Sequence, residues 1–270
     1  MIDDLFLQPK EISQALIKIG EKKANSSAFD ILIFGILAGI YIGFGGMAAT
    51  TVASGGTLDP GYTKFLMGTV FSTGLILVLI LGAELFTGNI LMMIGFLDGK
   101  YSMGKMLKNW GITFFGNFIG AIMLALLVAN SGLLGNCCNL TPVGIMADKI
   151  AQAKLSLGFW DSFYRGILCN MLVCMAVIMC VSSRTVTGKI FGIYFPIMAF
   201  VASGFEHSIA NMYFIPVALL AKNQFFSNFW SIWHNIIPVA LGNIAGGLLI
   251  VLLHPKSEKK LAKMLRSEDK

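Results

Sequence analysis

Charged residues are scarce in this chain of 270 residues. Asp, Glu, Lys and Arg make up 13% of it, whereas soluble domains carry about 25%. Apolar residues reach 56%, and several uncharged runs are long enough for the ~20 residues that a helix needs to cross a bilayer. A soluble globular domain is therefore excluded, and the composition predicts an all-α polytopic membrane protein.

Patterns for catalysis, metal binding and nucleic-acid binding are also missing. Of the five cysteines, three lie in one apolar run and two, Cys137 and Cys138, are adjacent in a loop, and no CxxC pair occurs. We find no nucleophile with a neighbouring base, no metal cluster and no acid–base pair, so neither an enzyme nor a cofactor or metal is expected. The net charge of +6 is spread between the apolar runs rather than gathered in one stripe with aromatics, which does not indicate nucleic-acid binding.

Turn signals group the apolar runs into six predicted crossings. Their approximate bounds are residues 29–52, 62–97, 106–131, 159–183, 189–222 and 230–254. Residues 1–28 are predicted as a cytoplasmic amphipathic helix, 132–158 as an outer connecting loop and 255–270 as a basic tail. Only five of the 20 Lys and Arg residues fall on the side away from the termini: Lys64, Lys149, Lys154, Arg165 and Lys222. By the positive-inside rule, both termini of a multi-pass protein of the cytoplasmic (inner) membrane are predicted to be cytoplasmic.

The chain contains an internal repeat. Glu84-Leu-Phe-Thr-Gly-Asn89 and Glu206-His-Ser-Ile-Ala-Asn211 both read Glu, four residues, Asn. Downstream, Asn109, Gly116, Asn117 and Gly120 have the spacing of Asn235, Gly242, Asn243 and Gly246, and the first crossing of each half shares a Gly-Ile-Leu motif at Gly35 and Gly166. Residues 29–131 and 159–254 are therefore predicted as two three-helix repeats. Because three is odd, the repeats must insert in opposite orientations.

The second and fifth crossings are predicted to be broken helices. We expect the breaks at residues 87–89 and 202–204, because irregular backbone at membrane depth persists only where it is buried in protein or lines a cavity. Half-helices that begin near the midplane point their free N–H groups toward it, which favours an anion. Thr87 would supply a hydroxyl and His207 a ring N–H at this depth.

The ionisable residues near the breaks receive different interpretations. A carboxylate in an anion path would repel its own substrate, so Glu84 and Glu206 are assigned to structural bracing. His207 lies at a helix break, which favours a functional role over that of a buried core residue. Lys154 could add positive potential from the outer loop, and the alternative is a solvated charge on an amphipathic loop helix.

Four stretches resemble the formate/nitrite transporter family. They are Gly82-Ala-Glu84-Leu-Phe-Thr87, Gly166-Ile-Leu-Cys-Asn170-Met-Leu-Val173-Cys, Ala202-Ser-Gly-Phe-Glu206-His207-Ser-Ile-Ala-Asn211-Met and Ile237-Pro-Val-Ala-Leu-Gly-Asn243. The resemblance covers nearly the whole chain. It implies an aquaporin-like protomer with six crossings, a homopentamer in the lipid bilayer, and one pore in each protomer.

The resemblance also implies roles for individual residues. The central histidine of the family falls on His207, the threonine of the break on Thr87 and the outer lysine on Lys154, with Lys149 as a substitute because the surrounding loop is dissimilar. Polar pore residues would be Asn170 and Asn211. Apolar constrictions would consist of Leu85, Phe86 and Phe200 on the inner side and of Phe71, Leu75 and Val173 toward the outer side.

Small monovalent weak-acid anions are the solutes that the resemblance implies: formate, nitrite or hydrosulfide. The stretch from Phe205 to Pro216 is more similar to formate-type members, while a hydrosulfide channel would use the same Thr, Lys and His. A further hypothesis is that His207 couples proton transfer to transport, so that flux rises as external pH falls. Two alternatives from other classes are a haem-bearing membrane anchor ligated by His207 and His234, and a water or glycerol channel, whose Asn-Pro-Ala pair this chain lacks.

Overall fold

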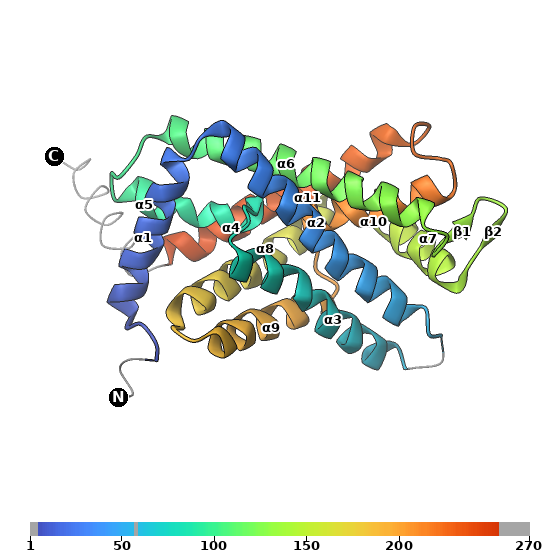
Figure 1. The fold of residues 1–270 in the computed structure, drawn as a ribbon, viewed down its shortest axis with the longest axis horizontal. Coiled ribbons are helices and arrows are strands. Elements are labelled where there is room, and N and C mark those ends of the chain that lie inside the picture. Colours follow the sequence, from blue (N-terminus) through green and yellow to red (C-terminus); the bar gives the residue numbers. More distant parts are fainter. Residues whose placement is uncertain (1–4, 57–58, 254–270) are drawn as a thin grey trace.

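The computed structural model describes residues 5–56 and 59–253, so the predicted basic tail, residues 255–270, lies outside the described residues. In chain order, the described elements are α1 (Pro9–Asn25), α2 (Ala28–Ala53), α3 (Pro60–Leu81), α4 (Phe86–Asn89), the 3-10 helix η2 (Ile90–Met92), α5 (Met93–Leu97), α6 (Met103–Asn130), β1 (Gly135–Asn136), β2 (Asn139–Leu140), α7 (Pro142–Leu155), α8 (Phe159–Ser182), α9 (Val186–Ala202), α10 (Ser208–Ala221) and α11 (Phe229–Leu252). Figure 1 shows α1 at one end of the elongated molecule and the β1–β2 hairpin at the other.

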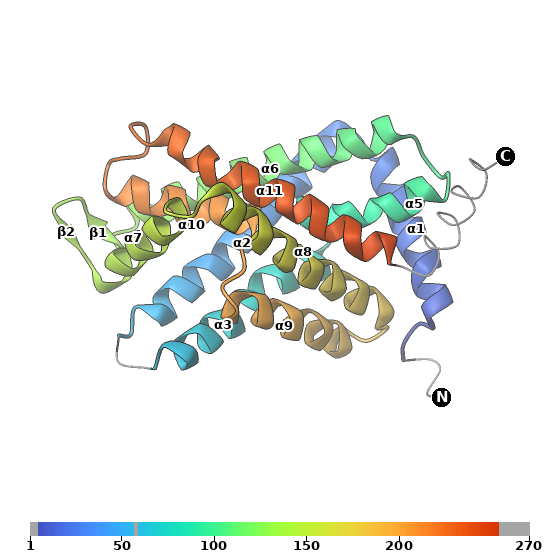
Figure 2. The ribbon, with the colours of Figure 1, turned by 180° about the vertical axis from the view of Figure 1, so that it is seen from behind.

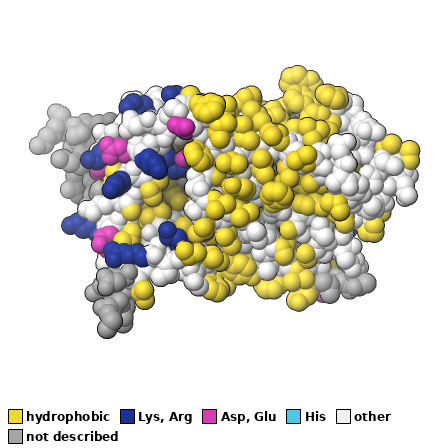
Figure 3. Space-filling model, in the orientation of Figure 1, with side chains coloured by type: hydrophobic (Ala, Val, Ile, Leu, Met, Phe, Trp, Pro, Cys, Tyr) yellow, Lys and Arg dark blue, Asp and Glu magenta, His cyan; other side chains and the backbone are white. Residues whose placement is uncertain are grey.

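Five of the described helices are long and apolar enough to cross a membrane: α2, α3, α6, α8 and α11. The segment Phe86–Leu97 and helices α9 and α10 are apolar but shorter. Exposed hydrophobic side chains cover much of the middle of the face seen in Figure 3, while Lys and Arg gather toward the end that carries α1. The chain is therefore a multi-pass helical membrane protein.

Most of the helix starts described below are capped by a side chain. Several helices begin at a polar side chain that accepts a hydrogen bond from the first turn, which satisfies one of the free N–H groups there. These capping residues are Ser27 for α2, Asp59 for α3, Ser102 for α6, Thr141 for α7 and Thr185 for α9. Helix α10 is capped in the same way by His207, whose ring accepts the N–H of Ala210, whereas α4 begins after Leu85, whose side chain caps nothing.

Two chain breaks separate α3 from α4 and α9 from α10. Helix α9 ends at Ala202 and Gly204 has a φ of +74°, so this break lies where the sequence predicted it. The first break differs from the prediction, because it covers residues 82–85, and Thr87 already belongs to α4. The reason is that Gly82 takes the left-handed conformation (φ +80°) that ends α3, whereas Gly88, which suggested the break, is helical.

The two halves pack in the same way. Helix α2 lies against α6, and α8 lies against α11, as both ribbon views show (Figures 1 and 2). A Cβ atom at Gly120 would overlap the carbonyl oxygen of Ile36, and one at Gly246 would overlap that of Ile167. Glycine at these two positions therefore allows the backbones of each helix pair to approach closely.

Helix α1 is docked into the fold. Its Leu16 and Ile17 are buried, and it contacts α5, η2, α6 and α8. The segment before it is tied to the turn between α8 and α9, where the Leu7 N–H donates to Ser182 O (2.7 Å) and the Arg184 N–H donates to Leu5 O (3.0 Å). This docking brings the end of α1 to the first chain break.

Candidate functional site

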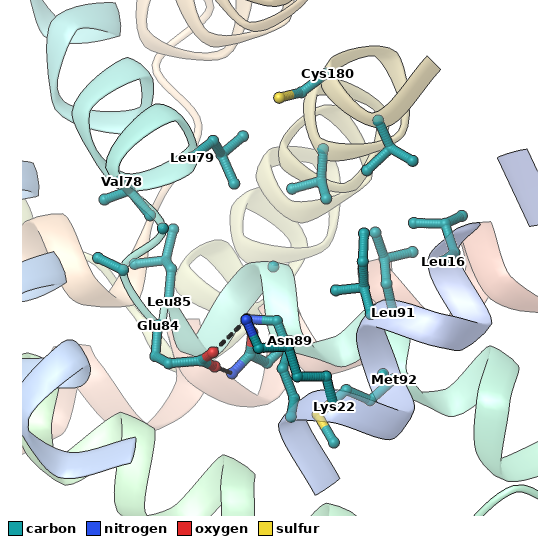
Figure 4. A pocket seen from close by; sticks show the side chains of 18 of the residues that line it. Leu16, Lys22, Val78, Leu79, Glu84, Leu85, Asn89, Leu91, Met92 and Cys180 are labelled. Carbon is teal, nitrogen blue, oxygen red and sulfur yellow. Dashed lines mark hydrogen bonds and ion pairs between the residues drawn. The ribbon is translucent and has the colours of Figure 1, made fainter. Parts of the chain in front are cut away.

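Two cavities approach the chain breaks from opposite ends of the molecule. The first, about 460 Å³, lies beside α1 and is here called the terminus-side vestibule (Figure 4). The second, about 310 Å³, lies beside α7 and is called the hairpin-side vestibule. Three basic side chains and one carboxylate line each of them. These are Lys22, Lys23, Lys189 and Glu84 in the first, and Lys64, Lys154, Arg165 and Glu206 in the second.

A four-residue network closes one wall of the terminus-side vestibule. The Lys23 Nζ donates to Glu84 Oε1 at 2.7 Å and to Asn89 Oδ1 at 3.0 Å. The Asn89 Nδ2 donates to Glu84 Oε2 at 2.6 Å and to Asn109 Oδ1 at 2.8 Å. Glu84 and Asn89 face each other beside a largely apolar wall that includes Leu85 and Leu91 (Figure 4). Both carboxylate oxygens of Glu84 are engaged in this network.

The hairpin-side vestibule contains a matching network, in which the lysine binds both carboxylate oxygens rather than one carboxylate oxygen and the asparagine. The Lys154 Nζ donates to both oxygens of Glu206 at 3.0 Å, and the Asn211 Nδ2 donates to Glu206 Oε2 at 2.6 Å and to Asn235 Oδ1 at 2.7 Å. Asn235 donates to the carbonyl oxygen of Lys154 (2.8 Å), as Asn109 does to that of Lys23 (3.4 Å). Lys154 is therefore the partner of Glu206, while Lys149 is exposed on α7.

Lys23 is the functional candidate that the sequence analysis missed. It occupies in the first half the position that Lys154 occupies in the second. A signal for it exists in the sequence, since Lys23 precedes Gly35 by the same number of residues as Lys154 precedes Gly166. Extending the repeat to the N-terminal side would have paired α1 with α7.

Two asparagines hold the backbone of the breaks. The Asn117 Oδ1 accepts the Phe86 N–H, and its Nδ2 donates to the carbonyl oxygens of Gly35 and Glu84. In the second half, the Asn243 Oδ1 accepts the Ser208 N–H, and its Nδ2 donates to Gly166 O and Glu206 O. These distances are all between 2.8 and 3.0 Å. Buried irregular backbone thus finds its hydrogen bonds in side chains from the neighbouring helix.

His207, which lines the hairpin-side vestibule, contacts Thr87, whose neighbour Gly88 lines the terminus-side vestibule. The His207 Nε2 lies 2.9 Å from Thr87 Oγ1, and the His207 Nδ1 accepts the Ala210 N–H at 3.1 Å. Because Nδ1 accepts, a neutral ring carries its proton on Nε2, which then donates to Thr87. The imidazole is 3% exposed and stacks on the ring of Phe200, whose centroid lies 5.9 Å away. The sequence predicted both polar residues, and the structure brings them into contact.

The predicted constriction residues do not divide as expected. Phe200, assigned to the inner side with Leu85 and Phe86, lines the hairpin-side vestibule together with Phe71, and their rings meet edge to face at 5.7 Å. The reason is that Phe200 lies near the end of α9, just before the second chain break, where its ring stacks on that of His207. Leu85 lines the terminus-side vestibule.

Other predicted residues are buried in helix contacts. Phe86 packs edge-on against Phe114, and Leu75 and Val173 are 2% and 1% exposed and line neither vestibule. Asn170 also lines neither vestibule.

The two predicted polar pore residues act as hydrogen-bond donors inside the protein. The Asn170 Nδ2 donates to Thr87 O (3.2 Å) and Asn243 O (2.6 Å), while Asn211 lines the hairpin-side vestibule and is bonded to Glu206. Of the two histidines of the haem alternative, His207 is buried, whereas His234 is exposed on α11 and lines neither vestibule.

The fold and site together define a multi-pass membrane protein with two vestibules, each lined by three basic side chains and one carboxylate, and with the buried imidazole of His207 lining the hairpin-side vestibule. The family model for formate/nitrite transporters matches residues 10–255. The chain belongs to the formate/nitrite transporter family, whose members are channels and transporters.

Relatives and solved structures agree with this assignment. A probable formate transporter of Methanothermobacter thermautotrophicus is 40% identical over 262 residues, which are 91% of this chain and 94% of the relative. The formate channel FocA of Escherichia coli strain K12 is 34% identical, with 92% of each chain covered. Among solved structures, an FNT family ion channel matches with a TM-score of 0.80 at 30% identity, covering 91% of this chain and 96% of its own. A pentameric formate channel with formate bound matches with a TM-score of 0.70 at 35% identity, covering 83% and 94%.

Proposed function

We propose that this protein carries small monovalent weak-acid anions, with formate as the preferred solute, across the cytoplasmic membrane. The observation that carries the proposal is the pair of matching Lys–Glu–Asn–Asn networks on either side of the His207–Thr87 contact. The relatives named as formate transporters and channels support formate, and the pentameric formate channel supports a homopentamer with one pore in each protomer. Nitrite and hydrosulfide are the alternative solutes.

In this proposal, the fold has six crossings in two inverted repeats. Segment α3 with Phe86–Leu97 forms the second crossing, and α9 with α10 forms the fifth. The basic residues near α1 favour cytoplasmic termini. The terminus-side vestibule is then the inner one, and the hairpin-side vestibule faces outward.

Electrostatics gives each vestibule its preference for anions. Each carboxylate is matched by the lysine that it binds, so the remaining two basic side chains leave the vestibule net positive. A positive cavity with low-dielectric walls raises the local concentration of anions. Cations would be repelled at both ends of the path.

Between the vestibules, an anion must leave water. Leu85 flanks the path on one side, and Phe71 and Phe200 flank it on the other. Transfer of a bare charge into such surroundings is very costly unless hydrogen-bond donors replace its hydration. The Nε2–H of His207 and the hydroxyl of Thr87 are the donors at this point.

A role for His207 in proton transfer follows from the same geometry. An imidazolium needs a proton on Nδ1, which now faces the Ala210 N–H, and it would stand at the positive N-terminus of α10. Protonation therefore becomes favourable only when an anion is beside the ring to compensate the charge. This links the proton to the arrival of the solute.

The test is anion flux in proteoliposomes, with formate, nitrite and hydrosulfide at two external pH values. We expect formate flux to be largest and to rise as external pH falls, and His207→Asn to reduce that rise. Equal passage of all three anions at both pH values would overturn the preference for formate and the role of His207. Swelling in glycerol without any anion dependence would instead favour a neutral-solute channel.

A further inference from the structure

The β1–β2 hairpin lies at the end of the molecule opposite α1 (Figures 1 and 2), and two adjacent cysteines occupy its turn. Strands β1 and β2 pair antiparallel, and Cys137 and Cys138 form the turn between them. Both side chains are exposed, and their Sγ atoms lie 3.5 Å apart. The other three cysteines are buried, and one of them, Cys180, lines the terminus-side vestibule.

The tip is held in one conformation by its own hydrogen bonds. The Asn136 Oδ1 accepts the N–H groups of both Cys138 and Asn139 at 3.1 Å. At the base of the hairpin, the Thr141 N–H donates to the carbonyl oxygen of the fully buried Leu134. The two thiols are therefore presented side by side on a braced loop that leads directly into α7.

A disulfide between these two residues is unfavourable. Consecutive Cα atoms across a trans peptide lie about 3.8 Å apart, whereas disulfides usually join Cα atoms roughly 4.4 to 6.8 Å apart. A bridging atom fits better, because two sulfurs bound at ~2.3 Å to one pyramidal or tetrahedral centre lie roughly 3.3 to 3.8 Å from each other. The observed separation of 3.5 Å falls within this range.

The donor set restricts which centre can bridge. Zinc in a protein usually takes four ligands. Within the described part of the chain, no group of three or more His, Cys, Asp or Glu side chains could hold a metal ion. The two thiols of Cys137 and Cys138 therefore match an atom that needs only two sulfur ligands from the protein.

We propose that Cys137 and Cys138 form a chelating site for trivalent arsenicals of the type R–As=O. In the condensation, two As–S bonds form, the As–O bond breaks, and the oxygen leaves as water with the two thiol protons. No oxidant or reductant is needed. The pKa of the Cys138 thiol is raised, chiefly by its hydrogen bond with Cys137, which keeps available a proton that this condensation consumes.

The chelate has a measurable signature. Once one As–S bond has formed, the second thiol attacks within the same loop at a high effective concentration. An arsenical bound by two sulfurs should therefore be displaced by a dithiol but not by a monothiol. A single-serine variant should lose at least about tenfold in affinity, because only one bond remains.

The experiment titrates the purified, full-length protein with phenylarsine oxide and reads the intact mass. We expect one phenylarsenic group per chain, which 2,3-dimercaptopropanol removes and an equal concentration of glutathione does not. Cys137→Ser and Cys138→Ser should each weaken binding, and the double variant should abolish it. Cys180→Ser is the matched control, because Cys180 lines the terminus-side vestibule, and it should bind as the wild type does.

Two results would overturn the proposal. One is unchanged affinity in either single-serine variant, and the other is removal of the group by glutathione as readily as by the dithiol. Loss of binding in Cys180→Ser would move the site to the vestibule. Thermal unfolding of each variant checks that the exposed substitutions leave the fold intact.

Discussion

The two halves of the molecule share a scaffold and differ at its centre. Leu85 (φ −112°, ψ 122°) and His207 (φ −114°, ψ 115°) have nearly the same backbone angles and stand at the same position, immediately before α4 and α10. Each follows the glutamate of its network and lies beside the asparagine that holds the break. One half presents an apolar side chain at this position and the other an imidazole, so the shared scaffold positions two chemically different groups.

A second difference lies in the helices that follow the breaks. Helix α10 continues for 14 residues, whereas α4 gives way after four residues to η2 and then α5. The first half contributes Thr87 from this short helix, and the hydroxyl reaches across to His207 of the second half. The contact between Thr87 and His207 therefore joins the two halves, and neither half could form it alone.

The largest expected effect, a loss of stability, comes from breaking the Lys23–Glu84 and Lys154–Glu206 ion pairs. Lys154→Met leaves the Glu206 carboxylate buried without its partner, and loss of one member of a buried pair costs about 3 to 5 kcal/mol of stability. Lys23→Met should cost less, because the side chains of Lys23 and Glu84 are 21% and 13% exposed, against 14% and 7% for Lys154 and Glu206. Thermal unfolding in detergent measures the order.

The double variant Lys154→Met/Glu206→Gln is the control for this prediction. Removing both charges should recover part of the stability, because no carboxylate is left buried without a partner. A double variant as unstable as the single one would show that Lys154 acts through packing rather than charge. Its ammonium also lies 5.4 Å from the centre of the Phe214 ring, so packing is the competing explanation.

A smaller effect is expected when the centre of the second half is made like that of the first. His207→Leu removes the ring donor, and a hydrogen bond to a charged group contributes about 1.5 to 3 kcal/mol. Formate flux in proteoliposomes should therefore fall roughly 10- to 100-fold. Leu85→Met is the matched control, since it keeps the other half apolar, and its flux should stay within about twofold of the wild type. Equal losses in both variants would mean that the centre responds to shape alone.

The sequence predicts the repeat well because its polar residues are unusual in an apolar chain. Glu84, Glu206 and their asparagines stand out by composition, and the break at Gly204 follows from the shortness of α9. The first break was misplaced because two glycines, Gly82 and Gly88, offered turn signals, and only the backbone angle distinguishes them.

Lys23 and Phe200 show what local patterns cannot convey. Lys23 stands in a polar helix beside Lys22, and only the docking of α1 distinguishes the partly buried, carboxylate-bound Lys23 from the exposed Lys22. Phe200 is apolar among apolar neighbours, so the vestibule that it lines depends on how α9 packs against α3. Both placements depend on the tertiary packing of helices, which a local sequence pattern does not reveal.

The smallest expected effect concerns the basic residues that do not bind a carboxylate. Lys22→Gln/Lys189→Gln should raise the formate concentration for half-maximal entry from the terminus side by a few-fold, because only the local potential is lowered. Lys64→Gln/Arg165→Gln should do the same from the hairpin side and leave the first direction unchanged. Both effects should shrink at high salt, since exposed charges are screened over about 8 Å at physiological ionic strength. Flux measured separately from each side of the membrane tests this prediction. If either double variant changed entry from both sides alike, the two vestibules would not be independent.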